Sequence, residues 1–202
     1  MNTTKISKND IKNVIDILKN GGIVAFPTDT VFGLACIINK EAISKIYEAK
    51  GRSFDKPLPM MCNSLEMIES VAYVSDKAKK IINKFVPGAI TLIFNKKDNI
   101  EDFVTNGKKT IGIRVPDDKW ILNLISELNE PILVTSANLS DTGSLTSFED
   151  VYKQLNGRID AIVCEDARGE TSSTIIDITN DVKLLRQGPI SLNDIMEVIN
   201  EK

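Results

Sequence analysis

The stretch GGIVAFPTDTVFGL, residues 21–34, indicates the fold most clearly. Residues 23–26 form a continuous apolar run, which is typical of a strand covered on both faces. Pro27 has no N–H to donate to a ladder, so it ends this strand. Thr28 and Thr30 follow directly, and α/β proteins hold their ligands at such strand ends. The stretch therefore predicts a buried strand that leads into a polar turn at the edge of a sheet.

Helix-like and strand-like segments intermix along the rest of the chain, joined by short connections. Further strands are expected at 90–94, 110–115, 132–135, 161–164, 174–178 and 182–185. Helices are expected after a cap at Ser7 or Asn9, over 41–49, after Ser64, Ser75, Pro116-Asp117 and Ser147, and from Ser191 to Ile199. This order predicts an α/β fold: a single domain over residues 1–202, with a twisted, mixed parallel/antiparallel sheet and flanking helices.

The composition excludes several kinds of site. The chain has no histidine, which rules out a Ser-His-Asp triad, His-ligated zinc and His acid–base catalysis. Three widely spaced cysteines, Cys36, Cys62 and Cys164, predict small buried side chains in a reducing compartment. The net charge of -3 gives no overall attraction to nucleic acid or anionic membranes. With no apolar run of signal-peptide or membrane-helix length, a cytoplasmic location without a membrane partner is expected.

Cationic side chains follow the helix expected at 41–49. Lys50 and Arg52 flank a glycine, and Lys56 comes shortly after. These cations can bind phosphate oxygens, but they can also be solvated charges that the dipole of a helix C-terminus favours. The polar turn after residue 26 has a similar alternative, because threonines and Asp29 often cap local backbone groups.

Further polar residues lie on or directly beside predicted strands. Arg114 lies within an apolar strand, and alternation places it on the face opposite to its apolar neighbours. There it can bind a carboxylate or form a surface salt bridge. Ser136 and Asn138 follow a buried strand and can hold phosphate or ribose oxygens, or make a simple turn. Ser173 precedes one apolar run and Arg186 ends another. Neither standard nucleotide-binding loop, GxxxxGK[ST] or GxGxxG, is present.

Taken together, the motifs are more specific than any one of them. In order they are GGIVAFPTDTVFGL, IYEAKGR with KPL, FVPGAITLIF, IGIRVPDD, ILVTSANLS, SSTIIDI and LLRQG. Their order and spacing over residues 21–188 resemble the YrdC/Sua5 family. The resemblance implies a YrdC-like fold and the synthesis of L-threonylcarbamoyladenylate from L-threonine, bicarbonate (or CO2) and ATP, with release of pyrophosphate.

The resemblance also implies roles for individual residues. The family's KxR and SxN elements match Lys50, Arg52, Ser136 and Asn138, and of these the two cations are expected to be catalytic. Substrate binding is implied for Thr28, Thr30, Lys56, Arg114, Ser136, Asn138, Ser173 and Arg186, with Thr30 and Arg114 on threonine and the last two at the nucleotide. No protein-held metal is expected, and Mg²⁺ arrives with ATP. Downstream proteins that transfer the threonylcarbamoyl group to tRNA are the implied partners.

Four positions depart from the family pattern. Phe32 stands where tyrosine is common, Ser53 where proline often follows KGR, Asp141 where glycine often follows SANxS, and Gln187 where RPG is usual. These departures concern loop geometry more than the hallmark residues. Polar segments at 96–109 and 141–146 are expected to form rims or lids of the site.

Two alternatives belong to other classes. One is a non-catalytic RNA-binding module, against which stand the acidic net charge and the 5% aromatic content. The other is the carbamoyltransferase-type module of hydrogenase maturation proteins, whose companion acylphosphatase and zinc-finger segments are not seen in this sequence. We expect the short, single-domain type of synthase, since the chain ends soon after Arg186.

Overall fold

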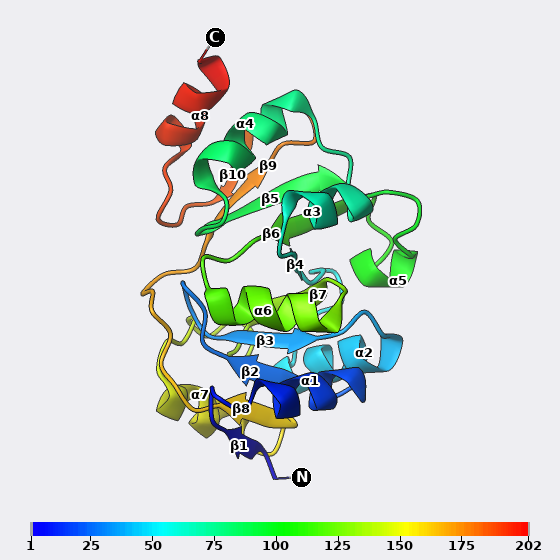
Figure 1. Cartoon of the computed structure of the whole chain (residues 1–202), viewed down its shortest axis with the longest axis vertical. Coiled ribbons are helices and arrows are strands. Elements are labelled where there is room, and N and C mark those ends of the chain that lie inside the picture. Colours follow the sequence, from blue (N-terminus) through cyan, green and yellow to red (C-terminus); the bar gives the residue numbers. More distant parts are fainter. Residues whose placement is uncertain (1, 202) are drawn as a thin grey trace.

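The computed structural model describes residues 2–201, whose strands form one continuous mixed sheet (Figure 1). Within these residues the sheet has ten strands in the order β1-β8-β2-β3-β7-β4-β6-β5-β9-β10. The pairs β1/β8, β2/β8, β4/β6 and β5/β9 are parallel, and the remaining neighbours are antiparallel. The predicted α/β fold with a mixed sheet is confirmed.

The elements have the following bounds. The strands are β1 (Thr4–Ile6), β2 (Val24–Phe26), β3 (Gly33–Cys36), β4 (Met60–Met61), β5 (Ile90–Asn95), β6 (Thr110–Arg114), β7 (Ile132–Ser136), β8 (Ala161–Val163), β9 (Thr174–Asp177) and β10 (Lys183–Arg186). The helices are α1 (Ile11–Lys19), α2 (Lys40–Lys50), α3 (Leu65–Val71), α4 (Asp76–Phe85), α5 (Asp102–Thr105), α6 (Lys119–Leu128), α7 (Phe148–Leu155) and α8 (Leu192–Asn200).

Side-chain caps fix where most helices begin. Ser64, Ser75, Ser147 and Ser191 each accept a hydrogen bond from a backbone N–H of the first turn, as the sequence predicts. Two helices differ from the prediction: Asp10 caps α1 in place of Ser7 or Asn9, and Asp118 caps α6, just after the predicted start at Pro116-Asp117. An aspartate satisfies the same unpaired N–H groups and also complements the positive end of the helix dipole.

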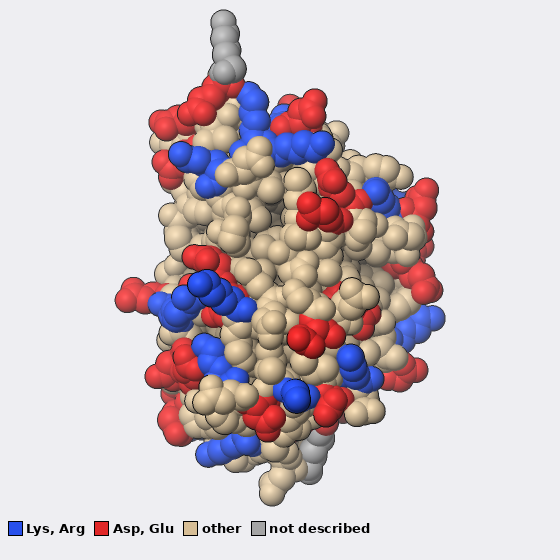
Figure 2. All heavy atoms as spheres, viewed as in Figure 1, with Lys and Arg blue, Asp and Glu red and all other residues tan. Residues whose placement is uncertain are grey.

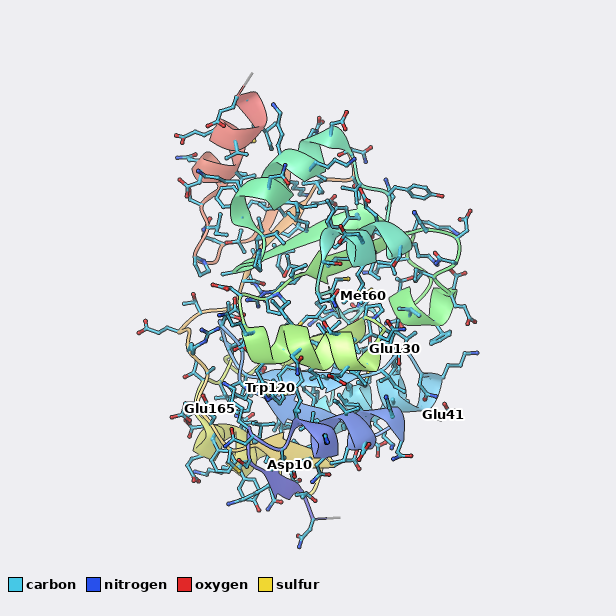
Figure 3. The ribbon with its side chains drawn as sticks, in the orientation of Figure 1. Asp10, Glu41, Met60, Trp120, Glu130 and Glu165 are labelled. Carbon is cyan, nitrogen blue, oxygen red and sulfur yellow. The ribbon has the colours of Figure 1, made fainter. Side chains whose placement is uncertain are left out.

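Two apolar layers enclose the sheet. Helices α1 and α6 pack on one face, where Val14 and Leu124 join the strand residue Phe26 in one cluster. On the other face a larger cluster includes Ile46 of α2 and Ile81 of α4 with Leu34, Met60, Ile113 and Leu92 of the strands. Figure 3 labels Met60 on β4, midway between the upper and lower groups of helices. Strand β2 is buried on both faces, as its unbroken apolar sequence predicts.

Beyond α1 and α6, side chains on one face of the sheet line a cavity. Along β5 and β6, Leu92 and Ile113 point into the larger cluster. Their neighbours Thr91, Gly112 and Arg114 line the cavity instead. Successive side chains of a strand point to opposite faces, so the alternation that the sequence shows at Arg114 sets its direction correctly.

Four short elements were not expected from the sequence: β1, β3, β4 and α5. Strand β4 has only two residues, Met60 and Met61, and pairs with β6 and β7 on its two sides. Strands this short carry no measurable alternation, and pairing with distant segments decides their conformation. Helix α5 lies within the predicted 96–109 loop, which is therefore partly structured.

The surface seen in Figure 2 carries acidic and basic side chains interspersed around an uncharged central band. Cys36 and Cys62 are buried as predicted, and burial raises the pKa of each thiol to about 12. The same prediction is wrong for Cys164, which is exposed just after the end of β8. No helix within residues 2–201 has the length and hydropathy needed to cross a bilayer.

Candidate functional site

A cavity of about 580 Å³ lies against the sheet and is lined by strand residues and by the segments that follow several strands. Eight predicted site residues line it: Thr28, Thr30, Arg52, Lys56, Arg114, Ser136, Ser173 and Arg186. These residues come from six separate parts of the sequence. The structure therefore brings them together, as the motif set predicts. Lys50 and Asn138 are not among the lining residues.

The cavity is strongly electropositive, although the whole chain is acidic. Among residues 2–201, its charged lining residues are Arg52, Lys56, Lys108, Arg114 and Arg186, against a single carboxylate, Asp177. Partial burial lowers the pKa of Arg186, and the positive charge of Arg114 lowers it further. Cations held this close to one another favour an anionic ligand, which would relieve their repulsion.

The hydroxyl groups of the 28–30 turn have a defined direction. The Thr28 hydroxyl donates to the carbonyl oxygen of Val31 at 2.6 Å, so its only proton is used there. It therefore accepts the bond that joins it to the Thr30 hydroxyl at 3.0 Å. Thr30 in turn accepts a bond from Arg114 at 2.7 Å. Because the Thr30 proton is used as well, its hydroxyl can only accept from a ligand, which suits an ammonium or hydroxyl donor.

Arg114 binds this turn from the neighbouring part of the sheet. Its Nη2 donates to Asp29 Oδ1 at 2.7 Å, and its Nε donates to the carbonyl of Gly88 at 3.1 Å. Both partners of the ion pair are nearly buried, with side-chain exposures of 7% and 10%. Burial lowers the pKa of Arg114, and the Asp29 carboxylate opposes that shift. The surface salt bridge considered from the sequence is thus a buried pair, and it fixes a guanidinium at the cavity wall.

Arg186 and Ser173 form a second fixed group. The Arg186 Nε donates to the Ser173 carbonyl at 3.0 Å, and its Nη2 lies 3.2 Å from the Ser173 hydroxyl. That hydroxyl lies 2.8 Å from the hydroxyl of Thr91 on β5. The edge strand β10 therefore presents a guanidinium whose orientation is set by Ser173, the residue directly before β9.

Arg52 and Lys56 belong to the segment that follows α2. Gly51 ends the helix with a left-handed φ of 57°, which glycine adopts without strain. Arg52 donates from Nε to the Lys56 carbonyl at 3.0 Å, which leaves N–H groups of its fork for a ligand. Lys56 lies 3.5 Å from Asp141, which has a φ of 62° where a glycine is common in the family. The two segments that were predicted to form rims of the site differ. Residues 96–109 contribute Thr105 and Lys108 to the cavity lining, whereas residues 141–146 contribute no lining residue.

Lys50 and Asn138 lie behind the cavity wall. Lys50 is 2% exposed, and its ammonium donates to the carbonyl oxygens of Ser136 and Asn138, the second at 2.6 Å. Asn138 in turn binds the carbonyls of Leu139 and Thr142 through its amide nitrogen. This placement differs from the direct phosphate contact that the sequence suggests for Lys50. It gives Lys50 the task of holding the loop that carries Ser136.

Burial makes Lys50 a source of pH-dependent stability. Desolvation lowers the pKa of its ammonium to about 7 from 10.5, and the charge of Arg52 adds to that effect. The unfolded chain therefore binds more protons between these values, so stability rises with pH from about 7 to 10.5.

We expect Lys50→Met to destabilise the protein, and to do so more at pH 9 than at pH 7. The variant leaves two buried carbonyls without a donor, at roughly 1–3 kcal/mol each. It also removes the rise in stability between pH 7 and pH 9, because methionine does not titrate. Urea unfolding of both proteins at the two pH values measures the difference. If the variant lost as much free energy of unfolding at pH 7 as at pH 9, or lost more at pH 7, this account of Lys50 would be wrong.

Some lining residues were not predicted as site residues: Thr91, Lys108 and Asp177. Two of them had a signal in the sequence. Thr91 alternates with the core residues Ile90 and Leu92, and on β9 Asp177 follows Ile175 at the same two-residue spacing. Lys108 lies in a polar loop, where no periodic pattern distinguishes it from other surface lysines.

Comparison with known proteins places this site within a family. The Sua5/YciO/YrdC family model, described as telomere recombination, matches residues 16–188. The threonylcarbamoyl-AMP synthase of Bacillus subtilis is 41% identical over 98% of this chain, which spans 59% of that relative. A putative threonylcarbamoyl-AMP synthase of Methanocaldococcus jannaschii is 37% identical, with 93% of this chain and 92% of the relative covered.

Solved structures agree with the sequence comparisons. The crystal structure of P. abyssi Sua5 complexed with L-threonine superimposes with a TM-score of 0.88 at 34% identity, over 98% of this chain and 60% of that one. The chain thus spans about three-fifths of these longer proteins. Since the family model covers most of its length and the cavity residues lie within the matched region, the chain belongs to the Sua5/YciO/YrdC family.

Proposed function

We propose that this protein is a threonylcarbamoyl-AMP synthase, a nucleotidyltransferase that acts on L-threonine, bicarbonate or CO2, and ATP. The observation that carries the proposal is the single cavity in which the Thr30–Arg114 group and the cations Arg52, Lys56 and Arg186 face one space. An amino acid and a triphosphate need these two kinds of environment side by side. The similarity to relatives of this name supports the same reaction.

The chemistry needs little from a general base. The neutral amine of threonine attacks CO2 (or bicarbonate, with loss of water), loses a proton and becomes an anionic carbamate. A carbamate oxygen then forms a bond to the α-phosphorus of ATP. The bond between that phosphorus and the bridging oxygen to the β-phosphate breaks, and pyrophosphate leaves with the electron pair. Because the nucleophile is already anionic, catalysis consists of alignment and charge stabilisation, which a site without histidine can supply.

The geometry suggests where each substrate lies. Thr30 accepts a bond from the threonine amine or hydroxyl, and Arg114 has N–H groups left to meet the carboxylate. Arg52 and Lys56 neutralise phosphate oxygens from the segment after α2, while Arg186 of β10 and Ser173, just before β9, bind the nucleotide. Lys50 acts on the reaction through the Ser136 loop that it holds.

Mg²⁺ belongs to this proposal as part of the nucleotide complex. Within residues 2–201 no group of three or more Asp, Glu, Cys or His side chains could hold a metal, and Asp177 is the only carboxylate that lines the cavity. The residues present thus fit a metal whose ligands are phosphate oxygens. When bound there, Mg²⁺ neutralises charge on the phosphates.

The test is threonine-dependent pyrophosphate release by the purified chain. With L-threonine, bicarbonate and Mg-ATP we expect pyrophosphate and a threonylcarbamoyl adenylate, and neither product when threonine is omitted. Pyrophosphate release that does not depend on threonine, or none at all from folded protein, would overturn the proposal. Salt-dependent tRNA binding without ATP turnover would instead favour the RNA-binding alternative. Transfer of the product to tRNA by partner proteins remains a prediction.

A further inference from the structure

The segment at residues 164–173 joins β8 to β9, two strands that lie at opposite ends of the sheet. We call its first part, residues 164–171, the strap. It runs along the side of the molecule, seen at the left in Figure 1, without regular secondary structure. On its way it passes the 28–30 turn and donates to it, since the Arg168 N–H binds the Thr28 carbonyl at 3.0 Å. None of the sequence motifs singles out the middle of this segment.

From this contact we propose that Gly169 and Arg168 are positioning residues, which hold the 28–30 turn in the geometry that the amino-acid substrate requires. The inference rests on the proposed function for the identity of that substrate. The strap determines the affinity for the amino acid and leaves the affinity for the nucleotide largely unaffected.

Gly169 is the point of closest approach. A Cβ added there would lie 2.5 Å from the Thr30 carbonyl oxygen, 2.6 Å from the Asp29 carbonyl oxygen and 2.6 Å from the Thr30 Cα. All three are backbone atoms, which cannot rotate away as the end of a side chain can. Gly169 is not among the glycines with positive φ, so the requirement is for space and not for an unusual conformation.

Arg168 fastens the strap on its other side. Its guanidinium donates to the Asp117 carbonyl and, at 3.2 Å, to the Asp118 carboxylate. Asp118 is buried and caps α6, so it is a rigid anchor. Asp117 links this anchor back to the 28–30 turn, because its N–H donates to the second carboxylate oxygen of Asp29 at 3.1 Å. The turn is thus held by the strap, by residues 117–118 and by Arg114.

The effect of the strap should fall on one end of the cavity. Moving Thr30 disturbs its bond from Arg114, and a misplacement of about 1 Å in such a group can cost about 10²-fold in rate. Arg52 and Lys56 follow α2 and make no hydrogen bond to the strap within the described chain. Nucleotide phosphates bound by these cations should therefore be insensitive to small shifts of the strap.

The experiment compares Gly169→Ala with Gly143→Ala by calorimetric titration of L-threonine and, separately, of a non-hydrolysable ATP analogue. Gly143 is the matched control because a Cβ there meets nothing within 4 Å. We expect the Kd for threonine to rise at least about tenfold in Gly169→Ala, with the Kd for the nucleotide analogue changed less than about threefold. The control should match the wild type for both ligands.

A second variant, Arg168→Met, keeps the proposal testable if Gly169→Ala does not fold, and it should raise the threonine Kd by a smaller factor. An unchanged threonine Kd in folded Gly169→Ala, or equal losses for both ligands, overturns the positioning role. Wild-type protein that binds threonine and analogue but releases no pyrophosphate would contradict the proposed function alone. Wild-type protein that binds no threonine would overturn both.

Discussion

Arg114→Met should lose both catalysis and stability, and the loss should be the largest that any single change in this cavity produces. The variant leaves the Asp29 carboxylate buried without its cation, for which a cost of about 3–5 kcal/mol is expected. It also removes the donors that face the substrate carboxylate and the bond that orients Thr30. We expect threonine-dependent pyrophosphate release to fall by about 10²–10³-fold. Urea unfolding and the pyrophosphate assay measure the two effects.

The double variant Asp29→Asn/Arg114→Met separates these effects. With the carboxylate replaced by an amide, no charge is left buried and unpaired, so most of the lost stability should return. Activity should not return, because the guanidinium is still missing. If activity recovered together with stability, Arg114 would be a structural residue and its assignment to the substrate would be wrong.

Arg52→Met should show the opposite combination, a large loss of activity with a nearly unchanged fold. Arg52 is only half-buried, and its hydrogen bonds go to two carbonyls of its own loop, those of Lys56 and Pro57. We expect turnover to fall about 10²–10³-fold because phosphate charge is no longer neutralised. The free energy of unfolding should change by less than about 1 kcal/mol.

Arg158→Met is the matched control for Arg52. Arg158 also donates to a carbonyl near the end of α2, that of Ala49, but it is exposed and does not line the cavity. Its replacement should leave turnover unchanged. Equal losses in the two variants would show that general surface charge, and not the position of Arg52, supports the reaction.

Much of the fold follows from local pattern. The unbroken apolar run of β2, the serine caps and the alternation around Arg114 each rest on interactions between near neighbours in sequence, so they could be predicted. The two-residue strand β4 could not, because it exists only through its pairing with β6 and β7. The position of β3 between β2 and β7 is a similar case, since a four-residue apolar segment does not indicate its own partners.

The site shows the same division. Residues at strand ends, such as Thr30 and Ser136, could be predicted to meet, because strand ends share one edge of a sheet. The inward turn of Lys50 could not, since nothing in its spacing distinguishes it from the exposed cations nearby. Only the tertiary structure shows that its ammonium satisfies two carbonyls of the 136–138 loop. The close approach of Gly169 to the 28–30 turn could not be predicted either, because contact between backbones that are distant in sequence leaves no local pattern.

We expect one cavity to hold an amino acid and a triphosphate next to each other. A crystal structure of the protein with L-threonine, bicarbonate and a non-hydrolysable ATP analogue tests it most directly. Our account predicts the threonine carboxylate within hydrogen-bond distance of Arg114, phosphate oxygens at Arg52 and Lys56, and the α-phosphorus facing the threonine nitrogen. Threonine and nucleotide bound on separate surfaces, or a nucleotide that makes no contact with these cations, would contradict it.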